Sequence, residues 1–197
     1  MEASIDDFPI ARPPQILPAI MRDTEALGFT MASDPRTGSL LRTLAASKPG
    51  GRLLELGTGT GAGAAWLLDG MDDAARLETV DQDEAAVAVA RRHLGGDRRV
   101  TFHLGDGATF LHDRAGQRYD LIFADTWPGK FSDLPAALAL LARGGLYVID
   151  DLLPQASWPE GHGAKVPPLL AALEGHADLY CARLAWATGI MVAARRS

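Results

Sequence analysis

The most constraining feature of the chain is the segment at residues 53–61, which reads Leu-Leu-Glu-Leu-Gly-Thr-Gly-Thr-Gly. The short apolar run at its start predicts a buried β-strand, and a helix-like pattern begins directly after the glycines, at Ala62. Glycine at such a junction lets the backbone turn tightly and lets a bound molecule approach main-chain atoms closely. The segment therefore predicts a site for a nucleoside-containing cofactor.

Strand and helix patterns alternate along most of the chain. Predicted strands cover residues 52–56, 77–80, 100–104, 119–124 and 146–149, and predicted helices cover residues 62–68, 84–94, 108–114 and 134–141. Such alternation is typical of a parallel sheet that helices cover on both faces.

The C-terminal part follows a different pattern. A predicted helix at residues 164–174 precedes two apolar runs, 179–186 and 190–194, which only three residues separate. Two strands this close must form an antiparallel hairpin, because a parallel return needs a crossover of about a dozen residues or more. The sequence thus predicts an α/β fold with a mostly parallel, seven-stranded sheet, an antiparallel C-terminal hairpin and helices on both faces.

The length of 197 residues fits one domain with a substantial core. We expect a single domain over residues 1–197, divided into an N-terminal helical extension, 1–35, and a cofactor-binding core, 36–197. Predicted helices cover residues 15–27 and 36–47, and Asp34 is the expected cap of the second.

The composition narrows the classes of partner. A formal net charge of −6 argues against a broad nucleic-acid surface, and no apolar stretch reaches the roughly 20 residues of a membrane helix. The acidic N-terminal residues do not resemble a signal peptide, and the single cysteine, Cys181, suits a reducing compartment. We expect a cytoplasmic protein that acts on a small molecule.

Acidic residues follow the predicted strands and distinguish between cofactors. Asp81 lies about 20 residues after the glycine turn, where a carboxylate can accept hydrogen bonds from both ribose hydroxyls. Glu55, just before the glycines, would oppose the pyrophosphate of NAD but can accept a hydrogen bond from an ammonium group. Asp106 is placed to accept one from an adenine amino group. This pattern fits S-adenosylmethionine better than NAD, although the looser dinucleotide fingerprint is also satisfied.

Several motifs then occur in a familiar order. They are Leu-Glu-Leu-Gly-Thr-Gly-Thr-Gly at 54–61, Glu-Thr-Val-Asp at 78–81, Gly-Asp-Gly at 105–107, Tyr-Asp-Leu-Ile-Phe-Ala-Asp at 119–125, Gly-Gly-Leu-Tyr-Val-Ile-Asp-Asp at 144–151 and Gly-Ile-Met-Val at 189–192. With these motifs the chain resembles class I S-adenosylmethionine-dependent methyltransferases. Within that class it resembles the small O-methyltransferases of the catechol and caffeoyl-CoA type, which implies their Rossmann-like methyltransferase fold.

The resemblance implies a set of cofactor-binding residues. Glu55, Gly57 and Gly63 would line the methionine part, Asp81 and Gln82 the ribose edge, and Asp106 and Gly107 the adenine. The cofactor-binding prediction also includes Thr58, Gly59 and Gly61 in the turn, and Asp125 after the fourth strand.

The resemblance also implies a metal site. In metal-dependent members an Asp after the fourth strand and a pair of residues after the fifth hold a divalent cation, and Asp125, Asp150 and Asp151 occupy these positions. Mg²⁺ or a similar cation would suit oxygen ligands of this kind. It would hold two vicinal hydroxyls of the acceptor and favour the ionised one as the nucleophile.

The catalytic residues expected from the resemblance are Asp125 and a lysine base. The family's lysine lies three residues after the first metal Asp, but here that position is Pro128, and the nearby lysine is Lys130. His162 is an alternative general base. Trp127 and the loop after Asp151, which contains Trp158, are expected to form the acceptor wall.

The expected function is therefore O-methylation of a small, catechol-like hydroxylated metabolite, with S-adenosylmethionine as the donor and with assistance from a divalent metal. Alternatives are a metal-independent methyltransferase acting on another small molecule or on an RNA base, an NAD-dependent oxidoreductase, and a non-catalytic S-adenosylmethionine-binding module. A homodimer through the N-terminal helices is also expected.

Overall fold

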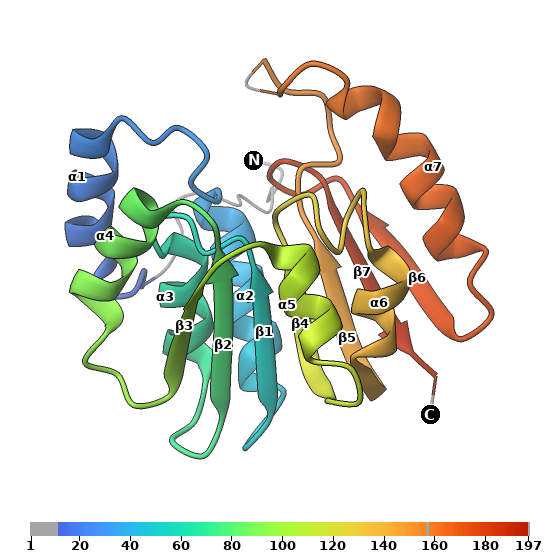
Figure 1. Ribbon diagram of the computed structural model, residues 1–197, viewed down its shortest axis with the longest axis horizontal. Coiled ribbons are helices and arrows are strands. Elements are labelled where there is room, and N and C mark those ends of the chain that lie inside the picture. Colours follow the sequence, from blue (N-terminus) through green and yellow to red (C-terminus); the bar gives the residue numbers. More distant parts are fainter. Residues whose placement is uncertain (1–11, 157, 197) are drawn as a thin grey trace, which may run out of the picture.

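A computed structural model describes residues 12–156 and 158–196 of the chain. Within these residues, seven strands form one sheet in the order β3-β2-β1-β4-β5-β7-β6 (Figure 1). The strands are β1 (Arg52–Leu56), β2 (Arg76–Asp81), β3 (Val100–Leu104), β4 (Tyr119–Ala124), β5 (Leu141–Ile149), β6 (Leu179–Leu184) and β7 (Ile190–Arg195). The strands β1 to β5 are parallel, and β7 runs antiparallel to both β5 and β6. The predicted fold class is confirmed.

Helices cover both faces of this sheet (Figure 1). They are α1 (Leu17–Leu27), α2 (Pro35–Ala46), α3 (Ala62–Gly70), α4 (Glu84–Leu94), α5 (Gly107–Asp113), α6 (Leu134–Ala139) and α7 (His162–Glu174). The helices α1 to α4 pack on one face, and α5 to α7 pack on the other. No helix in the described part of the chain is long and apolar enough to span a membrane.

The alternation of side chains along each strand builds two cores. In β1, Leu53 contributes to the core under α1 to α4, whereas Leu54 contributes to the core under α5 to α7. Leu121 and Ile122 of β4 divide in the same way. Because β1 and β4 are buried on both faces, most of their residues are apolar, as expected for central parallel strands.

The strand order reverses between β1 and β4, which lie side by side although β2 and β3 separate them in the sequence. In open α/β sheets, ligands bind at this point, beyond the carboxyl ends of the strands. The antiparallel strand β7 brings a further segment there, since the turn before it lies beside the end of β5: the amide of Leu153 donates to the carbonyl of Thr188 at 2.8 Å.

Several predicted boundaries differ from the observed ones. The strand β5 begins at Leu141 instead of residue 146, and α6 ends at Ala139 instead of residue 141. The reason is a register irregularity opposite Tyr119, which lets β5 pair with β4 on both sides of Gly144, a glycine with φ of 71°. Helix α7 begins two residues early, at His162. The part of the predicted N-terminal extension before residue 12 lies outside the described residues.

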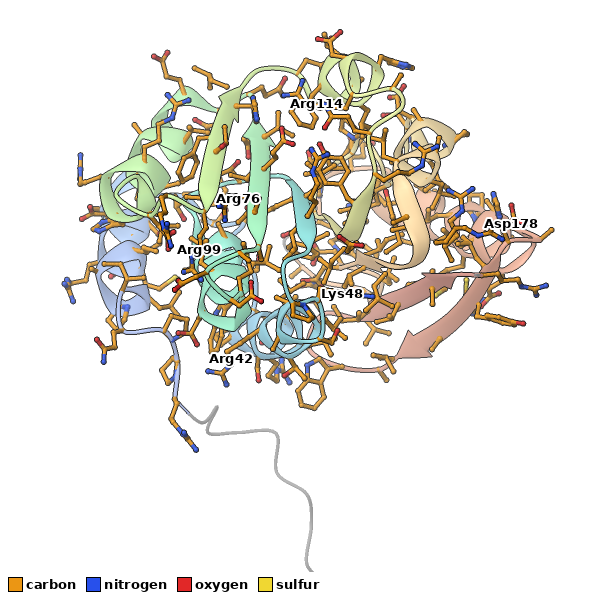
Figure 2. All side chains as sticks on the ribbon, turned by 90° about the horizontal axis from the view of Figure 1, so that it is seen from below. Arg42, Lys48, Arg76, Arg99, Arg114 and Asp178 are labelled. Atoms are coloured by element: carbon orange, nitrogen blue, oxygen red, sulfur yellow. The ribbon has the colours of Figure 1, made fainter. Side chains whose placement is uncertain are left out.

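The opposite end of the molecule, where the parallel strands begin, carries several basic side chains (Figure 2). Lys48 donates to the carbonyl of Gly144 at 2.9 Å, and Arg99 donates to the carbonyl of Met71 at 2.6 Å. The Nη1 atom of Arg76 is within 3.0 Å of three backbone carbonyl oxygens in the loop before β2. These basic side chains therefore hydrogen-bond to backbone carbonyls of loops at the end of the molecule that lies away from the predicted cofactor site.

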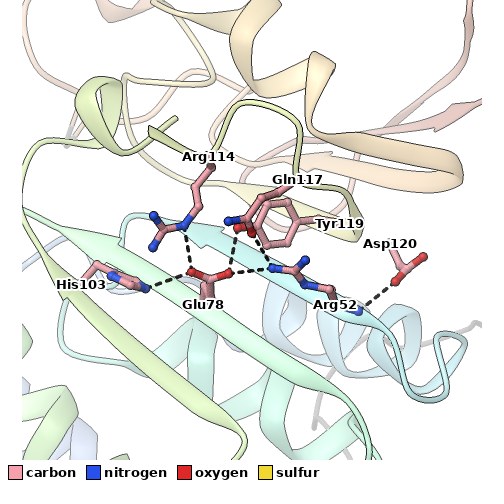
Figure 3. Close-up of polar contacts among 7 residues, drawn as sticks. All are labelled: Arg52, Glu78, His103, Arg114, Gln117, Tyr119 and Asp120. Atoms are coloured by element: carbon pink, nitrogen blue, oxygen red, sulfur yellow. Dashed lines mark hydrogen bonds and ion pairs between the residues drawn. The ribbon is translucent and has the colours of Figure 1, made fainter. Parts of the chain in front are cut away.

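A polar cluster lies on the α5 face of the sheet around Glu78 (Figure 3). The carboxylate of Glu78 accepts hydrogen bonds from Arg52 (3.2 Å), Arg114 (3.2 Å) and the hydroxyl of Tyr119 (2.9 Å), and it pairs with His103 at 3.1 Å. Burial opposes ionisation of Glu78, but the hydrogen bonds from Tyr119 and Arg114 outweigh it and lower the pKa of the carboxyl. The cluster joins β1, β2, β3 and β4 through side chains.

Candidate functional site

A cavity of about 510 Å³ lies at the carboxyl ends of the central strands, where the strand order reverses. This volume is within the usual range for a small-molecule site, about 300–1,000 Å³. Ten of the predicted site residues line it: Gly57, Thr58, Gly59, Gly63, Asp81, Gln82, Asp125, Lys130, Asp150 and Asp151. The structure therefore brings most of the predicted cofactor side and the predicted catalytic side together around one cavity.

The glycine turn shapes one wall of this cavity. Gly57 has a φ of 102°, and a Cβ atom there would lie 2.8 Å from the carbonyl oxygen of Asp125. At Gly59 a Cβ atom would lie 3.2 Å from the ring of Phe29, which comes from the segment between α1 and α2. A side chain is thus excluded at Gly57 by both conformation and space, and the main chain of the turn is left open to a ligand.

Asp81 holds the turn in place from the end of β2. Its Oδ2 accepts a hydrogen bond from the amide of Gly59 at 2.8 Å, and its Oδ1 accepts one from the amide of Asp83 at 3.0 Å. Gln82, the next residue, also lines the cavity. The carboxylate is therefore fixed at the edge of the cavity, in the position where the sequence places a ribose contact.

Glu55 is placed differently from the prediction. Its side chain is 1% exposed and does not line the cavity, because Gly63 lies directly over it: a Cβ atom at Gly63 would be 2.4 Å from Oε1. The hydroxyl of Thr79 donates to Oε2 at 2.6 Å. Burial raises the pKa of Glu55 to about 8, and the nearby Asp125 and Asp81 charges add to the shift. Glu55 therefore lies behind the glycine turn instead of facing the cavity.

Gly61 does not line the cavity either. It is the N-cap residue of α3 with a φ of 93°, and a Cβ atom there would lie 2.9 Å from the Cβ of Ala90 in α4. This glycine therefore permits close packing of the turn on α4.

Asp106 and Gly107 line a second cavity, of about 480 Å³, which shares Asp81 and Gln82 with the first. The Oδ2 atom of Asp106 accepts hydrogen bonds from the amide (2.8 Å) and the hydroxyl (2.9 Å) of Thr109, and Asp106 thereby caps the N-terminus of α5. These hydrogen bonds lower the pKa of Asp106. Its carboxylate is therefore engaged in helix capping beside the region where the sequence places the adenine.

The carboxylates predicted to hold a metal lie at the other end of the first cavity. Burial raises the pKa of Asp125, the charge of Asp150 adds to this, and Lys130 opposes it. Burial also raises the pKa of Asp150, against a hydrogen bond from the hydroxyl of Thr188. Among residues 12–156 and 158–196, no group of three or more His, Cys, Asp or Glu side chains is arranged to hold a metal ion. The geometry does not support the predicted metal site.

Lys130 lies in the loop after β4 and is 3% exposed. It faces the cavity, and its ammonium lies 5.2 Å from the centre of the Phe131 ring. Within the described residues, no carboxylate oxygen lies within 4.0 Å of this ammonium and no hydrogen bond engages it. The structure thus places at the wall of the cavity a buried positive charge that has an aromatic ring beside it and, among the described residues, no carboxylate or hydrogen-bond partner.

Aromatic side chains form the remaining wall. Trp127, Trp158 and His162 all line the cavity, and the rings of Trp158 and His162 stack with centroids 4.4 Å apart. Phe131 contacts His162 edge-on at 4.8 Å and Trp127 at 6.0 Å. The position of the predicted acceptor wall is thus an aromatic surface close to Lys130.

The alternative base, His162, is held at the start of α7. Its Nε2 lies 3.1 Å from the carbonyl oxygen of Asp151, and burial lowers the pKa of the imidazole. The ring is therefore oriented by a backbone contact in addition to its aromatic neighbours.

Three side chains at the acidic end were not expected from the sequence. Ser33 donates to Oδ2 of Asp125 at 3.1 Å, Thr188 donates to Oδ1 of Asp150, and Gln155 donates to Oδ1 of Asp151 at 2.5 Å. They come from the α1–α2 segment, the β6–β7 turn and the loop after β5. Only the tertiary fold brings Ser33 and Thr188 beside their carboxylates, so nothing in the local sequence marks them, whereas Gln155 lies four residues after Asp151 in the loop expected to form the acceptor wall.

Comparisons with known proteins agree with this arrangement. Residues 54–152, half of the chain, match the model of a family described as "Methyltransferase domain". A curated relative from Mycobacterium tuberculosis (strain ATCC 25618 / H37Rv), named "Probable O-methyltransferase Rv1220c", is 34% identical over 123 residues, which cover 60% of this chain and 55% of the relative. The match thus spans about half the length of that relative.

Solved structures support the fold over nearly the whole chain. An O-methyltransferase from Bacillus cereus in complex with SAH superposes with a TM-score of 0.83 at 17% identity, covering 95% of this chain and 94% of that one. The O-methyltransferase TomG from Streptomyces achromogenes, in complex with SAM, gives a TM-score of 0.82 at 22% identity, with coverages of 96% and 93%. The resemblance stated from the sequence is confirmed: the chain belongs to the methyltransferase domain family and has the fold of the class I O-methyltransferases.

Proposed function

We propose that this protein transfers a methyl group from S-adenosylmethionine to a hydroxyl oxygen of a small, planar molecule. Membership of the methyltransferase domain family supports the donor, and the names of the relatives, O-methyltransferases, support the acceptor atom. The observation that carries the proposal is the position of Lys130. A buried ammonium without a hydrogen-bond or close carboxylate partner is costly, so it is best explained by a ligand that supplies a negatively charged or polar oxygen.

The cavity fits the proposed cofactor. Gly57 and Gly59 adopt positive φ angles and leave the turn without side chains. Asp81 and Gln82 line the adjoining edge and offer acceptor and donor groups to a ribose. The second cavity, which Asp106 lines, shares Asp81 and Gln82 with the first and would take the adenine. When bound, S-adenosylmethionine supplies an electrophilic methyl group on a sulfonium. Glu55 would act from behind the turn, where the ammonium of the bound cofactor would favour its ionised form against the effect of burial.

The proposed reaction depends mainly on positioning. The acceptor oxygen loses its proton to solvent and forms the new C–O bond, while the C–S bond breaks and its electron pair stays on sulfur. Lys130 would hold the acceptor oxygen, and Trp127 and Trp158 would hold the plane of the acceptor. Holding the two reactants in line removes much of the entropic barrier of a bimolecular step.

The resemblance also implies a catechol-like acceptor that chelates a divalent cation. We keep a hydroxylated, planar acceptor in the proposal because an aromatic wall faces the cavity. We leave the cation out of the proposed mechanism, because the described carboxylates do not form a metal-binding group. A homodimer remains a prediction.

Two measurements test the proposal. Isothermal titration calorimetry should show binding of S-adenosylhomocysteine at one site and no binding of NAD; binding of NAD alone would contradict it. A panel of phenols and diphenols should then give S-adenosylhomocysteine as product. Turnover should fall sharply in Lys130→Met and stay unchanged in Lys48→Met, which removes a lysine at the opposite end of the molecule.

A further inference from the structure

A second lysine lies at the aromatic wall of the cavity. The ammonium of Lys165, in the first turn of α7, lies 5.0 Å from the centre of the Trp127 ring, which lines the cavity. The lysine side chain is half-buried and extends over this ring. His162, three residues earlier on the same face of α7, also lines the cavity. Lys165 therefore lies on the face of the helix that borders the cavity.

No carboxylate of the described residues pairs with the ammonium of Lys165. Within the part of the chain that the structure describes, no carboxylate oxygen lies within 4.0 Å of it and no hydrogen bond engages it. A tryptophan ring attracts a cation, but it does not supply an oxygen acceptor for the N–H donors. These donors are therefore free to bind an anionic group of a ligand.

Lys165 and Lys130 contact the same pair of aromatic rings. Lys165 lies over Trp127 and Lys130 lies 5.2 Å from the centre of Phe131, and the two rings meet edge to face with centroids 6.0 Å apart. Lys130 is buried and lines the cavity, whereas Lys165 is more exposed and does not line it. The aromatic wall thus has one positive charge inside the cavity and a second one at its outer border.

The opposite side of the cavity is acidic. Asp125, Asp150 and Asp151 all line it, and like charges repel, so an anionic substituent of an acceptor is unfavourable at that side. Beside Lys165 the same substituent meets an unpaired positive charge. The distribution of charge therefore favours one orientation of an anionic acceptor, with its charged group towards α7.

We infer that the acceptor is a hydroxylated aromatic molecule that also carries an anionic group, which pairs with Lys165 while the hydroxyl reacts inside the cavity. This inference rests on the proposed function, in which Trp127 and Trp158 hold the plane of the acceptor and Lys130 holds its hydroxyl oxygen. A planar molecule along the aromatic wall then has its two polar ends at the two lysines. Lys165 is thereby a specificity-determining residue, which selects the charge of the acceptor and takes no part in methyl transfer.

The first experiment compares two acceptors of similar shape that differ in charge. Initial rates are measured at saturating S-adenosylmethionine with 3-(4-hydroxyphenyl)propanoate and with its neutral amide. The KM for the acid should be lower by about fivefold or more at similar kcat, because a charge-assisted hydrogen bond remote from the reacting atoms strengthens binding alone. The difference should shrink at high ionic strength, since salt screens a partly exposed pair. A KM for the amide equal to or below that for the acid would overturn the inference.

Three variants assign the preference to Lys165. Lys165→Met should raise the KM for the acid to that for the amide and leave both constants for the amide unchanged. Lys165→Arg keeps the charge and should keep most of the preference. Lys48→Met, which removes a lysine from the opposite end of the molecule (Figure 2), should behave as the wild type. An equal loss for the acid and the amide in Lys165→Met would show a merely structural role and would also overturn the inference.

A second experiment measures the same preference without turnover. In calorimetry on the complex with S-adenosylhomocysteine, the acid should bind the wild type about fivefold or more tightly than it binds Lys165→Met. 2-(4-Hydroxyphenyl)ethyl phosphate, titrated in parallel, distinguishes the two sources of negative charge: the compound that binds more tightly identifies the group as carboxylate or phosphate. If S-adenosylhomocysteine binds but the acid and the amide are methylated equally well, the inference fails while the proposed function stands. If S-adenosylhomocysteine does not bind, the proposed function itself fails.

Discussion

Gly57 lies against the carbonyl of Asp125, and this contact joins the cofactor side of the cavity to its acidic side. The amide of Asp125 donates to the carbonyl of Leu56 at 2.9 Å, so the ends of β1 and β4 are tied together just before Gly57. A Cβ atom at Gly57 would lie 2.8 Å from the carbonyl oxygen of Asp125, so any side chain there would push the two segments apart. The position of Asp125 in the cavity therefore depends on a residue without a side chain.

Substitution of Gly57 by Ala should accordingly destabilise the protein and abolish binding of S-adenosylhomocysteine. The φ of 102° alone costs an L-residue about 1–3 kcal/mol, and the backbone clash adds to this. Thermal unfolding and calorimetry measure the two effects. Gly96→Ala is a matched control, because nothing lies within 4 Å of a Cβ at Gly96. A Gly57→Ala variant with normal stability and affinity would contradict the structural role given to this contact.

Asp81→Ala should weaken binding of S-adenosylhomocysteine more than it affects folding. The substitution removes the acceptor for the amide of Gly59 and the proposed acceptor for the ribose. Hydrogen bonds to a charged group contribute about 1.5–3 kcal/mol, so a loss of affinity of roughly 10- to 150-fold is expected. Asp72→Ala is the control: Asp72 also accepts from backbone amides, including Gly50 at 2.9 Å, but it lies outside the cavity. Equal affinities in the two variants would argue against the assignment of Asp81.

Glu55 should make the stability of the ligand-free protein fall as pH rises. Because the pKa of Glu55 is raised from 4.5 to about 8 in the folded state, the unfolded chain loses this proton first. Between about pH 4.5 and pH 8 the folded state therefore binds more protons than the unfolded state, and each pH unit costs up to about 1.4 kcal/mol of stability. Above about pH 8 the effect no longer grows.

The isosteric variant Glu55→Gln removes this dependence while keeping an oxygen that can accept from Thr79. Its Tm should equal that of the wild type near pH 4.5 and exceed it near pH 8. Other buried carboxyls, such as Asp125, contribute to the pH dependence of both proteins, so the difference between the two curves isolates Glu55. A constant difference in Tm across this range would show that Glu55 does not have the shifted pKa.

Glu78→Gln should destabilise the fold without changing cofactor binding. The carboxylate has several donors around it and keeps 18% exposure, so a loss of about 2 kcal/mol is expected, less than for a fully buried ion pair (Figure 3). Glu174→Gln, which breaks an exposed pair with Arg183, should leave the Tm almost unchanged. Denaturant unfolding measures both, and calorimetry with S-adenosylhomocysteine checks that the cavity is intact. A similar Tm for the two variants would mean that the Glu78 cluster contributes little.

The regular part of the fold could be predicted because its signals are local. Apolar runs, capping residues such as Asp83, and the short separation between residues 184 and 190 each determine nearby structure. The start of β5 could not be predicted, because Gly144 and Gly145 read as a turn and pair within the sheet only through an irregular register with β4. That register depends on packing between segments about 20 residues apart.

In the candidate site, too, the place of some residues could be predicted from local sequence and the place of others could not. Gly57, Asp81 and Asp125 follow strands directly, so their place at the sheet edge follows from the topology. The direction of the Glu55 side chain could not be predicted, because it depends on how closely α3 approaches β1 at Gly63. The donors Ser33 and Thr188 could not be predicted either, since they reach their carboxylates over separations of 92 and 38 residues.

The reversal of strand order between β1 and β4 has a consequence for how this protein can diversify. The glycine turn and Asp81 come from one half of the sheet, whereas Lys130, Trp158 and Thr188 come from the other half and its loops. Substitutions in the second half can therefore reshape the wall that faces the proposed acceptor and leave the nucleoside half intact. A directed-evolution library confined to residues 152–163 would explore new acceptors on an unchanged donor site.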